Sequence, residues 1–204
     1  MPAPLMTVDP NHPHTRSVDR AAEALRRGGL IAYPTGSGYG IGCDLSAKRT
    51  IDRLYQLKRA DRRKPFSILC PDLSDVARYG IVSKFAYRTM HQLAPGPFTF
   101  VLTATRLVPE MMTTKQKQVG IRIPSSPWVQ LLLAALGGPI VNSSATDSTG
   151  AALVDPRDIQ QQLGHALELI LDGGIQHFEP STVVSLIDDE VEILRQGQGV
   201  LPTS

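Results

Sequence analysis

Apolar stretches of strand length alternate with amphipathic stretches of helix length along most of this chain. Helical spacing is found at residues 15–29, 47–63, 83–94, 127–137 and 155–164, and in a short segment after Asp72. Strand-like runs are found at residues 30–35, 65–70, 98–105, 119–124, 139–145, 181–187 and 191–197, and residues 166–174 fit a strand or a short helix. This alternation predicts an α/β fold in which helices flank one sheet. The last two runs form a hairpin pattern around Asp188 and Asp189, so we expect a twisted sheet that mixes parallel and antiparallel strands.

We expect a single domain. The 204 residues contain no Ser/Gly linker, charge block or internal repeat that would divide them, and a chain of this length buries a sizeable core. Residues 1–14 are rich in proline and are predicted to form an extended arm, which leaves residues 15–204 for the domain.

The composition favours a cytoplasmic protein that does not cross a membrane. No signal-peptide pattern opens the sequence, and the longest apolar run is short and interrupted at residues 137–139. Cys43 and Cys70 have no metal or redox spacing, so reduced thiols are expected and a disulfide is the less favoured alternative. The formal net charge of +2 is too small for the field of a dedicated nucleic-acid binder. Any electrostatic function is therefore local.

The segment "YPTGSGYGIGCD", residues 33–44, has glycine at every second position from Gly36 to Gly42. It matches neither the dinucleotide fingerprint nor the P-loop. Glycine permits positive φ and a close approach of the backbone to a ligand, and Thr35, Ser37 and Tyr39 would present hydroxyls from such a turn. A glycine-rich strand connection that binds nothing explains the pattern equally well.

The densest positive charge lies in "LKRADRRKP", which contains Lys58, Arg59, Arg62, Arg63 and Lys64. At the end of a helix these cations are favourable without any ligand, because they complement the helix dipole. The functional alternative is an anion site, since arginine forks and lysine ammonium groups bind phosphate or carboxylate oxygens.

Arg122 is a single arginine within the apolar strand pattern "VGIRIP". An arginine in a core is costly unless an anion or a carboxylate partners it. Hydroxyl pairs at Ser143, Ser144 and Ser181, Thr182 follow predicted strands, where α/β proteins place ligands. Each pair taken alone is also typical of caps and turns.

Other chemistries have weaker support in the sequence. The five histidines show no helical ligand pair beyond His12 and His14 of the arm, so no metal-binding residue is predicted. There is no G-x-S-x-G elbow and neither cysteine has a catalytic signature, which disfavours covalent hydrolysis.

Taken in order, seven segments resemble the YrdC-like family over residues 15–199, nearer its YciO branch. They are "GGLIAYPTGSGYGIGCD", "LYQLKRADRRKPFSIL", "APGPFTFVLTAT", "VGIRIPSSP", "PIVNSSA", "LILDGG" and "PSTVVSLIDDEVEILRQG". The resemblance implies one twisted α/β domain with a basic concave cavity. It also implies a nucleotidyltransferase that makes threonylcarbamoyl-AMP and pyrophosphate from L-threonine, bicarbonate and ATP with Mg²⁺, for tRNA modification.

The resemblance also assigns roles to residues. Lys58 is the expected catalytic residue at the phosphates. The amino acid is expected at Thr35, Tyr39 and Arg122. The nucleotide is expected at a second set of residues: Lys58, Arg62, Ser144, Ser181 and Arg195.

Three positions depart from the synthase pattern. Ala60 replaces an arginine, Thr146 replaces an asparagine, and Gly36 replaces an acidic residue. Two expected polar contacts to the nucleotide and its phosphates are therefore missing, each worth about 1.5–3 kcal/mol where charge-assisted, and Arg59 or Arg62 is a candidate to compensate. Two alternatives therefore remain: a family member that binds double-stranded RNA or tRNA, and a nucleotide-binding relative with a different substrate. The sequence does not indicate an oligomeric state.

Overall fold

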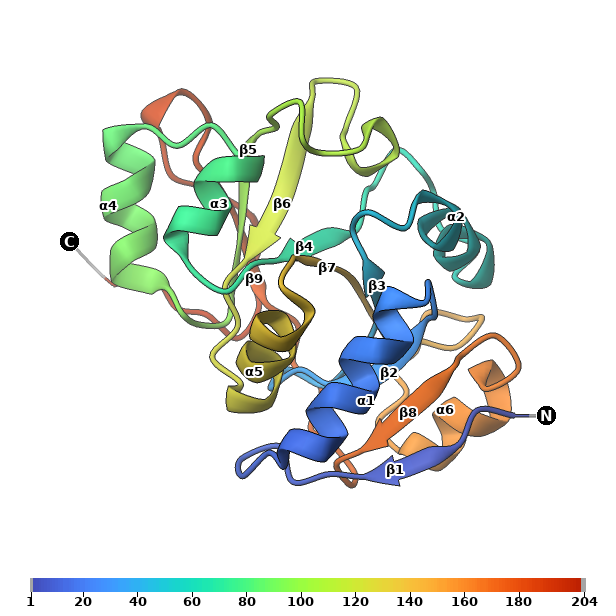
Figure 1. Ribbon diagram of the computed structural model, residues 1–204. Coiled ribbons are helices and arrows are strands. Elements are labelled where there is room, and N and C mark those ends of the chain that lie inside the picture. Colours follow the sequence, from blue (N-terminus) through green and yellow to red (C-terminus); the bar gives the residue numbers. More distant parts are fainter. Residues whose placement is uncertain (1, 203–204) are drawn as a thin grey trace.

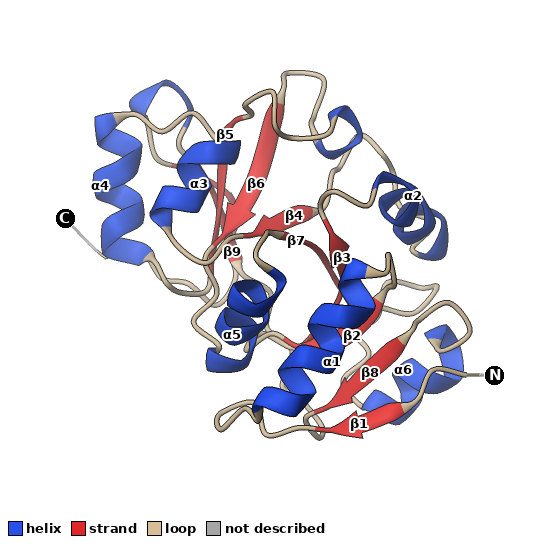
Figure 2. Ribbon diagram, in the orientation of Figure 1, coloured by secondary structure: helices blue, strands red, loops and turns tan. Residues whose placement is uncertain are grey.

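The computed structural model describes residues 2–202, which form ten strands and six α-helices (Figures 1 and 2). The strands are β1 (Leu5–Thr7), β2 (Ile31–Pro34), β3 (Tyr39–Asp44), β4 (Ser67–Leu69), β5 (Phe98–Thr103), β6 (Gln118–Arg122), β7 (Ile140–Ser144), β8 (Leu169–Asp172), β9 (Thr182–Ser185) and β10 (Glu192–Arg195). The helices are α1 (Thr15–Arg26), α2 (Lys48–Leu57), α3 (Leu73–Tyr79), α4 (Lys84–Leu93), α5 (Pro127–Leu136) and α6 (Pro156–Leu163), with short 3-10 helices at Glu110–Met112 and Ile187–Asp189.

One sheet contains all ten strands, in the order β1-β8-β2-β3-β7-β4-β6-β5-β9-β10. The pairs β1/β8, β2/β8, β4/β6 and β5/β9 are parallel, and the other five pairs are antiparallel. The predicted α/β fold with a mixed sheet is therefore confirmed. The closing hairpin is β9–β10, and the ambiguous segment at residues 166–174 contributes strand β8.

Helix boundaries follow from local chemistry. Helix α5 begins with proline directly after Ser126, whose hydroxyl accepts a hydrogen bond from the Val129 N–H, and it ends at Gly137 with a left-handed φ of 75°. Helix α2 ends at Leu57, well before residue 63, where the helical pattern ends. Arg59 adopts a positive φ of 45°, which a continuing helix does not permit. Most of the basic cluster therefore lies in a loop.

The glycine-rich segment divides into a turn and a strand. Gly36 and Gly38 take positive φ values of 83° and 114° in the turn between β2 and β3. Gly40 and Gly42 lie in β3 itself, opposite residues of both β2 and β7. The N-terminal segment is also part of the sheet, since β1 pairs with β8 at its edge.

The two faces of the sheet have different coverings. On one face, Ile68, Phe100, Ile121 and Val184 are buried in a large apolar core. On the other face, α1 and α5 pack side by side over the region of β2 and β8, around the buried Trp128 (Figure 1). The same face continues across β7, β4, β6, β5 and β9, where polar residues replace the apolar ones. That region forms the candidate site.

No helix among residues 2–202 combines the length and the hydropathy needed to cross a bilayer. Cys43 and Cys70 are buried free thiols, and no disulfide joins them. Burial raises the pKa of Cys43 to about 12 and also raises the pKa of Cys70, so both thiols stay protonated at neutral pH.

Candidate functional site

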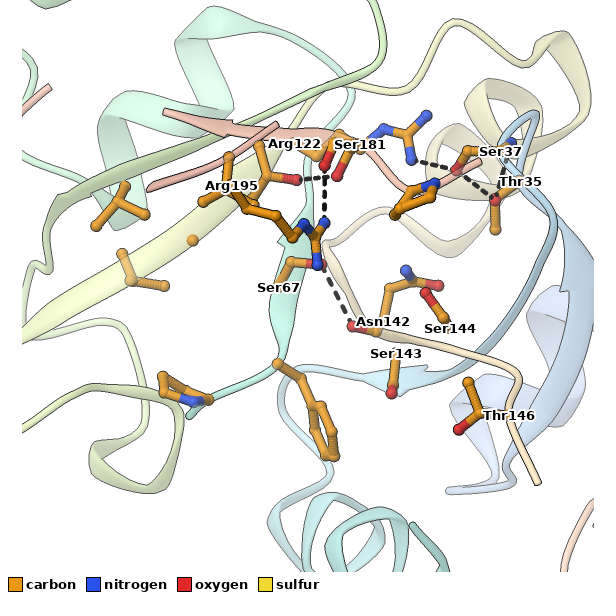
Figure 3. Close-up of a pocket in the computed structure, with 18 of the residues that line it drawn as sticks. Thr35, Ser37, Ser67, Arg122, Asn142, Ser143, Ser144, Thr146, Ser181 and Arg195 are labelled. Carbon is orange, nitrogen blue, oxygen red and sulfur yellow. Dashed lines mark hydrogen bonds between the residues drawn. The ribbon is translucent and has the colours of Figure 1, made fainter. Parts of the chain in front are cut away.

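A cavity of about 380 Å³ lies on the uncovered part of the sheet face (Figure 3). Its floor comes from residues of β5, β6 and β7, and its sides come from the β2–β3 turn, β9 and β10. The lining contains two arginines, Arg122 and Arg195, together with hydroxyl and amide side chains. Among residues 2–202 no aspartate or glutamate lines it. A cavity with this lining favours anionic ligands.

Six of the residues predicted from the sequence meet in this cavity. They are Thr35, Tyr39, Arg122, Ser144, Ser181 and Arg195. Lys58 and Arg62 do not line it.

Arg122 is the most unusual residue of the site. Its side chain is only 6% exposed, and it donates from Nη1 to Ser37 Oγ at 2.8 Å and from Nε to the Gly96 carbonyl at 3.3 Å. Within residues 2–202 it forms no ion pair. Burial lowers the pKa of Arg122, because desolvation disfavours the charged form. A buried guanidinium without a carboxylate partner is the arrangement that a ligand anion completes.

The turn between β2 and β3 holds its own hydroxyls in place. Thr35 donates from its backbone N–H and from Oγ1 to the Gly38 carbonyl, at 2.8 and 2.9 Å. Ser37 Oγ lies 3.2 Å from Thr35 Oγ1 and also accepts from Arg122. Figure 3 shows this chain from Arg122 through Ser37 to Thr35 at one end of the cavity.

Tyr39 lines the cavity, but its hydroxyl is engaged elsewhere. It donates to the Gly174 carbonyl at 2.8 Å and accepts from the Gly173 N–H at 2.9 Å. Burial raises the pKa of Tyr39 to about 12, so the phenol is neutral. The hydroxyl thus fastens the loop after β8 to the site.

Ser181 and Arg195 line the cavity on the side of β9 and β10. Ser181 Oγ lies 2.8 Å from Thr99 Oγ1, and Arg195 Nη2 donates to the Ser181 carbonyl at 2.7 Å (Figure 3). Arg195 lies on the exposed edge strand β10 and, like Arg122, forms no ion pair within residues 2–202. The lining of one cavity therefore contains two cations, Arg122 and Arg195.

Lys58 lies at the margin of the cavity. Its Nζ donates to the carbonyl of Thr146, at 3.1 Å, and to the Thr146 hydroxyl, and Thr146 itself lines the cavity. Burial lowers the pKa of Lys58 from 10.5 to about 8, against an opposing effect of the Asp147 charge.

Arg62 lies in a different environment. Its Nη2 donates to Asp52 Oδ1 at 2.6 Å, and its guanidinium carbon lies 5.0 Å from the centre of the Tyr55 ring. In this arrangement Arg62 is paired with helix α2.

Sequence reasoning missed Asn142 and Gly120. Asn142 faces the cavity from β7, and its side chain lies over Gly40, where a Cβ atom would overlap Asn142 Oδ1. Gly120 lies two residues before Arg122 in β6 and leaves the floor open. Side chains two residues apart in a strand point to the same face, so counting back from Arg122 would have placed Gly120 on the cavity face.

Three comparisons place the chain among known proteins. The family profile described as "Telomere recombination", which covers Sua5, YciO and YrdC proteins, matches residues 23–197. The chain is 36% identical to YciO of Escherichia coli over 194 residues, which is 94% of each chain. The crystal structure of E. coli YciO superposes with a TM-score of 0.91, covering 97% of both chains.

More distant similarities reach proteins with a stated activity. The chain is 28% identical over 181 residues to the threonylcarbamoyl-AMP synthase of Coxiella burnetii, covering 87% of this chain and 97% of that one. The crystal structure of Sua5 from P. abyssi complexed with L-threonine shares the fold. Its TM-score is 0.88 at 24% identity, and the match covers 96% of this chain and 58% of that one.

Proposed function

The chain belongs to the Sua5/YciO/YrdC family, and from this premise we propose that it is an ATP-using synthase of the threonylcarbamoyl-AMP type. In this proposal the cavity joins L-threonine, bicarbonate and ATP into threonylcarbamoyl-AMP and releases pyrophosphate. Mg²⁺ enters bound to ATP. Similarity to threonylcarbamoyl-AMP synthases along most of the chain supports the reaction class.

The observation that carries the proposal is the buried Arg122, which among residues 2–202 has no carboxylate partner and lies in a cavity with no acidic lining residue. An amino-acid carboxylate would complete the charge of Arg122 and would also accept from the hydroxyl of Ser37. A small carboxylic acid fits this end because the β2–β3 turn closes it. A nucleotide would then extend toward Ser181 and Arg195.

The reaction requires positive charge where the amino acid meets the nucleotide. A carbamate that attacks an α-phosphorus brings two anions together, so nearby cations lower the barrier. Lys58 and Arg195 would balance the charge on the phosphates, and Ser144 would donate to an oxygen. Holding both substrates in one cavity supplies the remaining advantage, through proximity.

The direct test is a turnover assay on the purified protein. With ATP, Mg²⁺, bicarbonate and L-threonine, we expect threonine-dependent release of pyrophosphate and a product of the mass of threonylcarbamoyl-AMP. Reactions without bicarbonate or without threonine are the controls. ATP binding without product would contradict the proposal and favour a relative with another acceptor, the alternative suggested by Ala60 and Thr146.

A second test fills the cavity floor. A Cβ at Gly120 would lie 4.0 Å from Ser67 Cβ and 3.3 Å from Thr99 Cγ2, a tight contact that requires a small shift of Thr99. Valine suits a strand and would occupy ligand space. Gly120→Val is expected to weaken ATP binding at least ~10-fold in calorimetric titrations, with an unfolding free energy within ~1 kcal/mol of wild type. The matched control is Gly138→Ala, whose Cβ would have no atom within 4 Å. Unchanged ATP affinity in Gly120→Val would place the nucleotide elsewhere.

Binding of double-stranded RNA or tRNA has less support in the structure. Of the basic cluster, Arg62 pairs with Asp52 and Arg63 pairs with Asp61, which reduces the charge available to phosphates. If RNA binding exists, its affinity must fall steeply with salt, because phosphate contacts release counterions.

A further inference from the structure

Asn142 occupies the middle of the cavity, and within residues 2–202 its amide nitrogen has no hydrogen-bond acceptor. Its Oδ1 accepts a hydrogen bond from the Tyr33 hydroxyl at 2.8 Å. Its Nδ2 makes no hydrogen bond within residues 2–202, and Figure 3 shows that nitrogen directed into the space between Ser37 and Arg195. The side chain therefore presents two N–H donors to a ligand.

Tyr33 and two glycines fix this orientation. Tyr33 is fully buried, and burial raises its pKa, so its hydroxyl keeps a proton and acts as the donor. A Cβ at Gly42 would lie 2.8 Å from the Tyr33 hydroxyl, and a Cβ at Gly40 would overlap Asn142. The absence of side chains at these two positions of β3 gives the Tyr33 ring and the Asn142 amide the space to meet.

The position of Asn142 indicates which part of the ligand it faces. Thr35, beside Asn142 over Gly40, connects through Ser37 to Arg122 at the carboxylate end. Ser181 contacts Thr99 of β5, beside the strand that carries Arg122, and Arg195 enters the cavity from β10. Figure 3 shows the Asn142 amide between Thr35 and Arg195. In a ligand whose carboxylate lies at Arg122 and whose nucleotide extends toward Arg195, the group that links the two parts is the nitrogen substituent of the amino acid. A donor at this point attracts a carbonyl oxygen and repels an ammonium group.

We propose that Asn142, positioned by Tyr33, is the specificity-determining residue that recognises the oxygen of a carboxylated amine and so selects the N-carboxylated amino acid over the free one. This inference rests on the proposed function, since it assumes an amino acid at Arg122. It predicts that the affinity for a ligand depends on the group bound to the ligand's nitrogen and not only on its carboxylate.

The test compares two stable probes by calorimetric titration: L-threonine and N-carbamoyl-L-threonine, which carries the carbonyl oxygen and lacks the ammonium charge. Wild type is expected to bind the carbamoyl compound ~10-fold more tightly than threonine. Asn142→Ser is expected to bring the ratio near one. Asn142→Asp is expected to invert it, because a carboxylate facing the cavity attracts the ammonium group.

Tyr33→Phe is the positioning control and is expected to reduce the ratio partway, because the amide loses its fixed partner. Thermal unfolding of each variant checks folding, and Asn142→Ser serves if the aspartate variant does not fold. Inversion of the ratio without any turnover would support the role of Asn142 while the synthase proposal fails. If wild type turned over and all variants had the same ratio of carbamoyl-threonine affinity to threonine affinity, the role of Asn142 would be overturned. The synthase proposal would then still stand.

Discussion

Replacing Arg122 with methionine is expected to weaken L-threonine binding on the order of 100-fold or more without destabilising the fold. The loss follows from the removal of a buried cation that a ligand carboxylate would pair with, an interaction worth about 2–5 kcal/mol. The protein loses hydrogen bonds to Ser37 and Gly96, but it also loses the desolvation cost of an unpaired charge. We expect the unfolding free energy to stay within ~1 kcal/mol of wild type.

Urea unfolding and threonine titration on the same preparation measure both quantities. The matched control is Arg195→Met, which removes the second arginine of the cavity and is expected to weaken ATP binding with little effect on threonine. A large loss of stability in Arg122→Met, with threonine affinity retained, would show that Arg122 is a structural residue and not a ligand-binding one.

The order of helices and strands could be predicted because hydrophobic periodicity is a local property. The strand character of Gly40 and Gly42 could not, since glycine has low strand propensity and these two are tolerated for tertiary reasons. They face Asn142 and Tyr33, which are distant in sequence. Likewise the early end of α2 depends on the backbone of Arg59, which has no clear sequence signal.

Part of the site could be predicted because one residue violated a physical rule. Arg122 stood out as a charge in an apolar strand, and it lies in the cavity. Asn142 and Ser37 have ordinary polar identities, so only the register of the strands and the path of the turn reveal their roles. Lys58 and Arg62 were assigned from the family resemblance, which does not specify side-chain partners. Lys58 lies at the margin of the cavity, hydrogen-bonded to Thr146, and Arg62 pairs with Asp52.

The affinity for ATP is expected to fall as the pH rises from about 7.5 to about 10, following the titration of Lys58. The pKa of Lys58 is lowered to about 8, so the side chain is charged at the start of this range and neutral at its end. A charged hydrogen bond to phosphate contributes about 1.5–3 kcal/mol, which corresponds to a ~10- to 150-fold loss of affinity. In Lys58→Met, ATP affinity is expected to be low and almost independent of pH.

The free energy of unfolding is expected to rise over the pH range in which ATP affinity falls. Because the pKa of Lys58 is lower in the folded state than the ordinary 10.5, the unfolded chain binds more protons between pH 8 and 10.5, and stability rises with pH there. The cost of burying the charge is thus present below pH 8 and is relieved above it. Comparison of wild type with Lys58→Met in urea unfolding isolates this contribution from the titrating tyrosines. If ATP affinity fell together with stability, unfolding would explain the loss of affinity. If ATP affinity fell while stability rose, the loss would be assigned to the charge of Lys58 at the ligand. An ATP affinity that does not depend on pH would show that Lys58 is not part of the nucleotide site.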